Sequence, residues 1–187
     1  MLLSESTLRK RLDEVIAIAK KWLKDASYEY KLHDERLDTL RLTWWAVKFV
    51  TTLDNQETAV EARVFRDKKL AILVENAPDV PLNRAYAEYA AKLLTISLIL
   101  RYFENIVKKC TKTIFYKGDP ETPHFVMFVF DVVNGKAIAT LDIGIENENI
   151  IISEVLYSPN GKRIFTFESD FEGAAQLFKS FMLEILI

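Results

Sequence analysis

The stretch 86–107 limits the possible folds more than any other part of this chain. Its apolar residues are spaced alternately three and four positions apart, which is the pattern of a helix with one continuous apolar stripe. A second apolar line follows another side of the same stretch, so the predicted helix needs a cover on two sides. One cover can be a sheet of this chain, and the other its remaining helices or a second copy. The residues of the first line, which we call the heptad stripe, are Tyr86, Tyr89, Leu93, Ile96, Leu100, Phe103 and Val107.

Residues typical of β-strands precede and follow this helix in two series. Short pieces rich in turn-forming residues separate the strands, which predicts antiparallel meanders. We expect 33–36 to be one of these turns, and 43–50 to be a central strand covered on both faces because both of its faces are largely apolar. The predicted strands are 28–32, 39–53, 58–66 and 70–75 before the helix, and 113–116, 125–133, 137–146, 150–157 and 163–168 after it.

Two further helices are predicted near the ends of the chain. Residues 6–26 have apolar positions on one side only, with Ser4 or Ser6 available as the N-cap. Ser169 and Glu172 match the S-x-x-E capping pattern, which predicts a C-terminal helix that begins there. Both helices therefore have an apolar side that must pack on a sheet.

One hairpin in the second series can be given a register. Asn134-Gly135 lies between two apolar runs, and this dipeptide favours a two-residue type I′ turn. Such a turn places Asp131 opposite Ile138, and it leaves Asp142 near the far end of the hairpin. The two carboxylates are therefore not expected to form the directly facing pair that a glycosidase needs.

The element order predicts an α+β fold. It consists of two antiparallel β-meanders with a long central helix, and with N- and C-terminal helices packed on the sheet. We expect a single domain over 1–187. Each half is a meander closed by a helix, which suggests a pseudo-duplicated arrangement with halves 1–110 and 111–187, although no residue-level repeat accompanies it.

Composition excludes several classes of function. The 25 Lys and Arg residues are balanced by 27 Asp and Glu residues, so charge gives no reason to expect nucleic acid or an anionic membrane as partner. The five glycines form no phosphate-binding motif, and the single cysteine and two histidines lack metal-ligand spacing. We therefore expect no cofactor, no metal and no membrane span. The start of the chain lacks the pattern of a secretory signal, which predicts a cytoplasmic protein.

The one compact group of chemistry-bearing residues is His33, Asp34 and Glu35, with Asp38 close by as a further possible metal ligand. The simpler interpretation is a polar hairpin loop. The alternative is that His33 acts as a base oriented by Asp34 or Glu35, which requires a concave site. We assign no catalytic residue from the sequence, and an enzyme is the less favoured class.

Two functional hypotheses follow from the surplus of apolar surface. The first is a non-enzymatic adaptor or chaperone-like protein that binds a protein or peptide and forms a homodimer through the heptad stripe, chiefly Tyr86, Tyr89, Leu93, Ile96, Leu100 and Phe103. The alternative is a protein that binds a small apolar ligand in a pocket between sheet and long helix, lined by Trp44, Phe128 and Phe130. The high content of Ile, Lys and Glu, with few glycines, is also typical of thermophilic proteins.

The order of elements resembles that of the secretion-chaperone type of α+β protein. In those proteins helices flank a strongly bent antiparallel sheet, and the molecule dimerises to hold peptides. The resemblance rests on element order over the whole chain and on no specific residue, and this chain has more strands. It implies the first of the two hypotheses, a dimeric peptide-binding protein.

Overall fold

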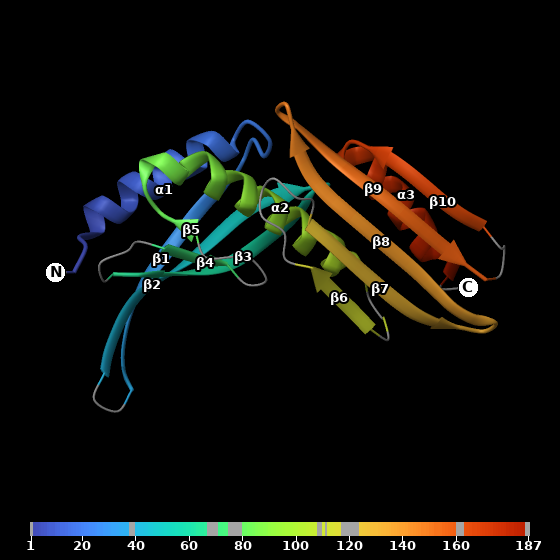
Figure 1. Ribbon diagram of the computed structural model, residues 1–187, viewed down its shortest axis with the longest axis horizontal. Coiled ribbons are helices and arrows are strands. Elements are labelled where there is room, and N and C mark those ends of the chain that lie inside the picture. The colour runs from blue at the N-terminus through green and yellow to red at the C-terminus, as the bar shows by residue number, and fades with distance from the viewer. Residues whose placement is uncertain are drawn as a thin grey trace. The chain divides into compact units, whose positions relative to one another are not determined.

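The protein has an α+β fold with two five-stranded antiparallel sheets (Figure 1). The computed structural model describes residues 2–37, 40–66, 71–74, 80–107, 110, 112–116, 124–159 and 163–185. The chain divides into two compact units, Met1–Leu98 and Ile99–Ile187. This division falls within helix α2, Ala87–Ile106, rather than at residue 110. Each sheet therefore belongs to its own unit, and each unit is described by itself.

The N-terminal unit contains a meander in which each strand pairs with the next one along the chain. Helix α1 ends at residue 19, earlier than the predicted 26, and Ser4 is its N-cap, because the amide of Thr7 donates to the Ser4 hydroxyl at 3.2 Å. The elements of this unit are α1 (Glu5–Ala19), β1 (Ser27–Leu37), β2 (Leu40–Leu53), β3 (Gln56–Phe65), β4 (Ala71–Val74), β5 (Val80–Pro81), the short 3-10 helix Arg84–Tyr86 and the first part of α2.

Helices α1 and α2 lie on one face of this sheet (Figure 1). Trp45, Val47 and Phe49 of β2 point toward that side and are buried, as are Val60 and Val64 of β3. The buried residues of α1 are Leu8, Leu12, Val15, Ile16 and Ala19, which is the apolar side predicted from the sequence. The core of the unit therefore lies between the helices and one sheet face only.

Two predictions about this sheet are wrong. Residues 33–36 are not a turn, because β1 continues through them and pairs with β2 as far as Leu37 and Leu40. Strand β3 pairs only as far as Trp44, so the β1–β2 hairpin extends beyond it as a two-stranded arm (Figure 1). Strand β2 is central, as predicted, but the described helices cover one of its faces rather than both.

The C-terminal unit contains the second meander, and α3 packs on it. Its inner face is filled by Val126, Phe128 and Phe130 of β7 and by alternate residues of β8 and β9. Its elements are the end of α2, β6 (Lys112–Tyr116), β7 (His124–Val132), β8 (Gly135–Glu146), β9 (Asn149–Ser158), β10 (Arg163–Ser169) and α3 (Phe171–Ile185). Four rings from the two helices, Tyr102, Phe103, Phe171 and Phe178, meet at centroid distances of 5.1–6.2 Å.

The β7–β8 hairpin has a different register from the predicted one. Val132 pairs with Gly135 and Asp131 with Lys136, so the turn residues are 133–134 and Asp131 does not face Ile138. The shift is two residues in the pairing, and it leaves every side chain on its expected face because side chains alternate with a period of two. The N-cap of α3 is Asp170, one residue later than the predicted Ser169. Its carboxylate accepts from the amide of Gly173 at 2.9 Å.

Three of the seven residues of the heptad stripe belong to the core. Leu93, Ile96 and Phe103 are 0–1% exposed, whereas Tyr86, in the 3-10 helix that precedes α2, is 45% exposed. The side chain of Tyr89 is half-buried, as is that of Leu100. A role of the stripe in dimerisation therefore stays a prediction, and Tyr86 is its most accessible residue. None of the described helices is long and apolar enough to cross a membrane.

Candidate binding groove on the N-terminal sheet

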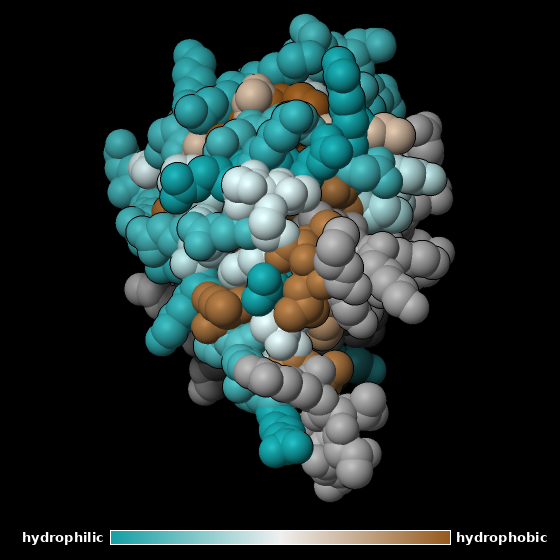
Figure 2. Space-filling model, turned by 90° about the vertical axis from the view of Figure 1, so that its left-hand side faces the viewer, coloured by the Kyte–Doolittle hydropathy of each residue, from teal (hydrophilic) through white to brown (hydrophobic). Residues whose placement is uncertain are grey.

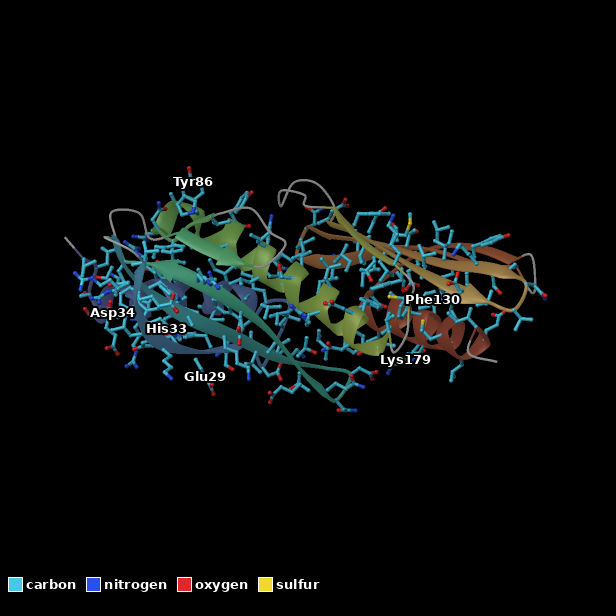
Figure 3. All side chains as sticks on the ribbon, turned by 90° about the horizontal axis from the view of Figure 1, so that it is seen from below. Glu29, His33, Asp34, Tyr86, Phe130 and Lys179 are labelled. Carbon is cyan, nitrogen blue, oxygen red and sulfur yellow. The ribbon has the colours of Figure 1, made fainter. Side chains whose placement is uncertain are left out.

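The face of the N-terminal sheet that points away from α1 and α2 carries polar and charged side chains, and we call it the open face. Strand alternation places on it every second residue of each strand, in rows fixed by the β1–β2 and β2–β3 registers. Its residues are Ser27, Glu29, Lys31, His33 and Glu35 of β1, Leu42, Trp44, Ala46, Lys48 and Val50 of β2, and Glu57, Ala59, Glu61, Arg63 and Phe65 of β3. Glu29 and His33 are labelled in Figure 3, where this sheet lies in front of the helices.

A groove of about 490 Å³ crosses the open face. Ala46 forms its floor on the central strand, where a methyl group stands between Lys31 on one neighbour and Arg63 on the other. Because the flanking side chains are much longer than that methyl group, the sheet is hollowed at this row. The residues that line the groove are His33, Glu35, Trp44, Ala46, Glu61, Ala62 and Arg63.

Trp44 forms one end of the groove and is held on two sides. The His33 ring lies nearly parallel to the Trp44 ring, at a centroid distance of 5.6 Å and an interplanar angle of 11°. The guanidinium of Arg63 lies 5.9 Å from the Trp44 ring centroid, within cation–π distance. Trp44 is 8% exposed, and no described helix lies over this face. The aromatic end of the groove is therefore a fixed wall.

Charged rows border the groove along the strands. Glu29, Lys48 and Glu61 are directly opposite one another on β1, β2 and β3. In the next row Lys31 and Arg63 stand on either side of Ala46. Charges of both signs therefore surround the small central residue. A ligand that fills the groove meets cations beside Ala46 and carboxylates farther along the strands.

The structure separates the three residues of the predicted cluster His33, Asp34 and Glu35. His33 and Glu35 both line the groove, whereas Asp34 lies between them in β1 and points to the opposite face. The strand thus places Asp34 and His33 on different sides of the sheet. Among the residues that the structure describes, no group of three His, Cys, Asp or Glu side chains is arranged to hold a metal ion.

The three rings predicted to line a ligand pocket have separate surroundings. Trp44 lies on the open face, whereas Phe128 and Phe130 are 1% and 3% exposed in the core of the C-terminal unit. There the Phe128 ring lies 6.0 Å from that of Phe178, and the Phe130 ring lies 6.5 Å from that of Phe181. Phe128 and Phe130 therefore pack against α3.

Four lining residues were not identified as a site from the sequence: Ala46, Glu61, Ala62 and Arg63. The alternation in β3 does place Glu61 and Arg63 on a solvent-facing side, so one part of the signal is present in the sequence. The missing part is the register, which sets Ala46 beside Arg63 and within reach of His33. That register depends on continuing β1 through 33–36, where a turn was predicted.

A second hollow, of about 740 Å³, lies where α1 meets β1, and the hydroxyls of its two tyrosines are paired with carboxylates of α1. The Tyr28 hydroxyl donates to the Asp13 carboxylate at 2.5 Å, and the Tyr30 hydroxyl donates to Glu5. Burial and the bond to Asp13 raise the pKa of Tyr28. The guanidinium of Arg9 in α1 lies 6.0 Å from the Tyr30 ring centroid. This group fastens α1 to the edge of the sheet.

Viewed from its N-terminal side, the surface is mainly hydrophilic, with a small group of hydrophobic side chains (Figure 2).

No protein-family model, curated protein or solved structure matches this chain. A function must therefore be argued from the groove and from the surfaces themselves, since the fold class alone does not define one.

Proposed function

We propose that this chain is a non-enzymatic, homodimeric, cytoplasmic binding protein that holds a polar segment of another protein or a peptide in the groove on the open face. The observation that carries the proposal is the groove itself, with Ala46 at its floor, the fixed Trp44 wall and charged walls of both signs. Its volume lies within the range of about 300–1,000 Å³ that ligand sites have.

The lining favours a peptide over an apolar small molecule. Small-molecule pockets are lined mainly by apolar and aromatic side chains, with few polar groups. Here Glu35, Glu61 and Arg63 are exposed and form the walls, and Trp44 is the one large aromatic ring. A protein segment offers both charged side chains and backbone groups, which can pair with carboxylates and a guanidinium together.

The groove offers little support for catalysis. A histidine base needs an orienting carboxylate within hydrogen-bond distance. The alternation of β1 places Asp34 on the other face of the sheet, and Glu35, which lines the groove with His33, has no described hydrogen bond to it. The described contact of the His33 ring is its stacking on Trp44. His33 therefore serves as part of the aromatic wall in this proposal.

The test is a selection with a library of random peptides displayed on phage, against the immobilised full chain. Peptides that bind the wild type are then measured against two matched variants. Ala46→Leu fills the floor of the groove, and Ala59→Leu adds the same side chain to the same face outside the groove. We expect Ala46→Leu to weaken binding at least about tenfold, and Ala59→Leu to leave it within about twofold.

Equal binding by the two variants would contradict the proposal, as would a failure to enrich any peptide. The alternative of a small apolar ligand stays a prediction and is tested on the same proteins. Binding of an apolar fluorescent dye such as anilinonaphthalene sulfonate would favour it if the dye binds the folded wild type and Ala46→Leu equally.

A further inference from the structure

The C-terminal sheet also has a face that α3 does not cover, and this face is apolar. In Figure 3, α3 lies on one side of β7–β10, and the side chains on the other side have no described element of this unit over them. Val155 and Tyr157 of β9 are 39% and 36% exposed there. We call this surface the outer face, and its apolar residues are Phe125, Met127, Val129, Ile138, Ile151, Val155 and Tyr157.

The registers of β7, β8 and β9 align these residues into rows. Val129, Ile138 and Tyr157 are directly opposite one another, which makes a continuous apolar row across three strands. The next row holds Met127 and Val155 on either side of a threonine. Cross-strand rows of this kind form a continuous surface rather than scattered apolar side chains.

Among the described residues, charged side chains stand at the borders of these rows, and Lys112 of β6, which pairs with Val129, ends the row through Ile138 on one side. Asp131 and Lys136 form an ion pair at 2.5 Å at one end, so each already has its partner within the chain. Asp142 is exposed at the other end, opposite Phe125. An apolar centre with a polar rim is the arrangement of a protein–protein interface, and aromatic residues and Met are enriched in such centres.

The size and shape of the face favour a second copy of this chain. Strands β7, β8 and β9 have 9, 12 and 10 residues, so at about 4.8 Å spacing and about 3.4 Å per residue they present roughly 500 Å². Stable complexes bury about 800 Å² on each partner, so these three strands supply more than half of what a dimer needs. Two identical sheets have the same twist, which is the condition for face-to-face packing at about 30°.

We infer that the outer face is the homodimer interface, in which the β7–β9 rows of two copies pack against each other around a two-fold axis. Ile138 lies in the middle of the continuous row and is the central contact. The inference rests on the homodimeric state in the proposed function, and it replaces the heptad stripe as the dimer surface. It does not depend on the groove.

The test is size-exclusion chromatography with light scattering on the full chain, at about 1 to 100 μM. We expect the wild type to have twice the chain mass of 21.6 kDa. Ile138→Glu places a charge at the centre of the interface and is expected to give a monomer. The matched control is Ala59→Glu, which adds the same charge to the open face of the other sheet and is expected to stay dimeric. Far-UV circular dichroism checks that every variant is folded.

Tyr157→Ser keeps the test decisive if Ile138→Glu does not fold. It removes a half-exposed ring from the same row and is expected to weaken the dimer at least about tenfold. A wild type that is monomeric throughout overturns both this inference and the homodimeric state, while peptide binding is judged separately by Ala46→Leu. A dimer that Tyr157→Ser and Ile138→Glu leave unchanged overturns only the outer face as its interface.

Discussion

The two sheets share strand number and meander order, but their uncovered faces differ in chemistry. The open face of the N-terminal sheet is charged and hollowed at Ala46. The outer face of the C-terminal sheet is apolar along the row through Ile138. A charged groove suits a ligand that exchanges with water, whereas a continuous apolar face is typical of a surface that another protein covers. The same topology thus supports two different modes of binding.

The covered faces of the two sheets differ as well. The N-terminal sheet places apolar residues such as Val47 and Phe49 under its helices. The covered face of the C-terminal sheet includes Glu154 of β9, which is fully buried. Neither of its carboxylate oxygens has a hydrogen-bond partner among the described residues. Leu141 lies opposite Glu154 in the sheet. Burial raises the pKa of Glu154 to about 8, so the group is neutral at pH 7.

The largest predicted effect is the loss of stability of the C-terminal unit as the pH rises. The pKa of Glu154 is about 8 in the folded state against an ordinary 4.5, so between these values the folded protein holds a proton that the unfolded chain has lost. The free energy of unfolding therefore falls by about 1.4 kcal/mol per pH unit in this range, about 5 kcal/mol in total, and no further above it. Urea unfolding followed by far-UV circular dichroism at several pH values measures this slope.

Glu154→Gln is the control for that slope, because the amide has nearly the same shape and does not titrate. Between pH 5 and 8, a range of about three units, we expect the free energy of unfolding of this variant not to show the decrease that the titration of Glu154 causes in the wild type. Glu154→Leu is expected to stabilise the unit at pH 7 by about 1–3 kcal/mol, since it removes an unpaired buried polar group. A wild-type slope that persists in both variants would show that Glu154 is not its source.

The next effect tests whether the two units are separate in stability as well as in packing. Phe178→Ala removes a fully buried ring that meets Phe103 and Phe128, and it should cost about 3–5 kcal/mol. Trp22, Trp44 and Trp45 are the three tryptophans of the chain, and all belong to the N-terminal unit. Tryptophan fluorescence therefore reports that unit alone.

We expect Phe178→Ala to shift the transition seen by circular dichroism and to leave most of the tryptophan transition in place. Val47→Ala, in the core of the N-terminal unit, is the matched variant, with the opposite pattern expected. Equal shifts of both signals in both variants would mean that the chain unfolds as one cooperative unit.

How far the sequence predicts this structure depends on whether local or long-range pairing decides a feature. The α+β class, the long helix and most strands follow from apolar periodicity, which each segment carries itself. The end of β1 does not, because the polar run at 33–36 has the composition of a turn, yet it is held in the sheet by pairing with 41–44. Charged residues are common on edge strands, which cannot be recognised before the strand order is known.

The candidate site shows the same limit. The alternation in β3 predicts that Glu61 and Arg63 share a face, but only the register brings them to Ala46 and His33. Glu154 has a related signal, because Ile152 and Leu156 on either side of it are apolar at the same spacing. Without knowing which face α3 covers, that pattern does not show that the carboxyl group is buried.

The smallest predicted effect concerns Asp25, a carboxylate whose pKa is shifted in the opposite direction from that of Glu154. Asp25, between α1 and β1, accepts from the Thr51 hydroxyl at 2.7 Å and from the Thr52 amide at 2.8 Å, and the bonds from Thr52 lower its pKa. A lowered pKa in the folded state gives stability that is present above the ordinary value of 3.8 and is lost as the pH falls through the folded value. The two carboxylates therefore give pH dependences of opposite sign.

Asp25→Ala should lower the free energy of unfolding of the N-terminal unit by about 1 kcal/mol at pH 7. The hydroxyl of Thr51, a residue only 1% exposed, loses its acceptor in this variant. Asp25 itself is exposed, so solvent limits the contribution of its charge. The measurement is urea unfolding followed by tryptophan fluorescence at pH 7 and near pH 3, about one unit below the ordinary value. The cost should shrink at the lower pH, because below the ordinary value the unfolded wild type takes up a proton on Asp25 more readily than the folded protein does, which removes part of the stability that the carboxylate gives. Asp13→Ala is the comparison variant for a general loss of negative charge, because it removes a carboxylate of α1 that accepts from the Tyr28 hydroxyl. A cost of Asp25→Ala that is the same at both pH values would assign the effect to packing around the turn rather than to the carboxylate.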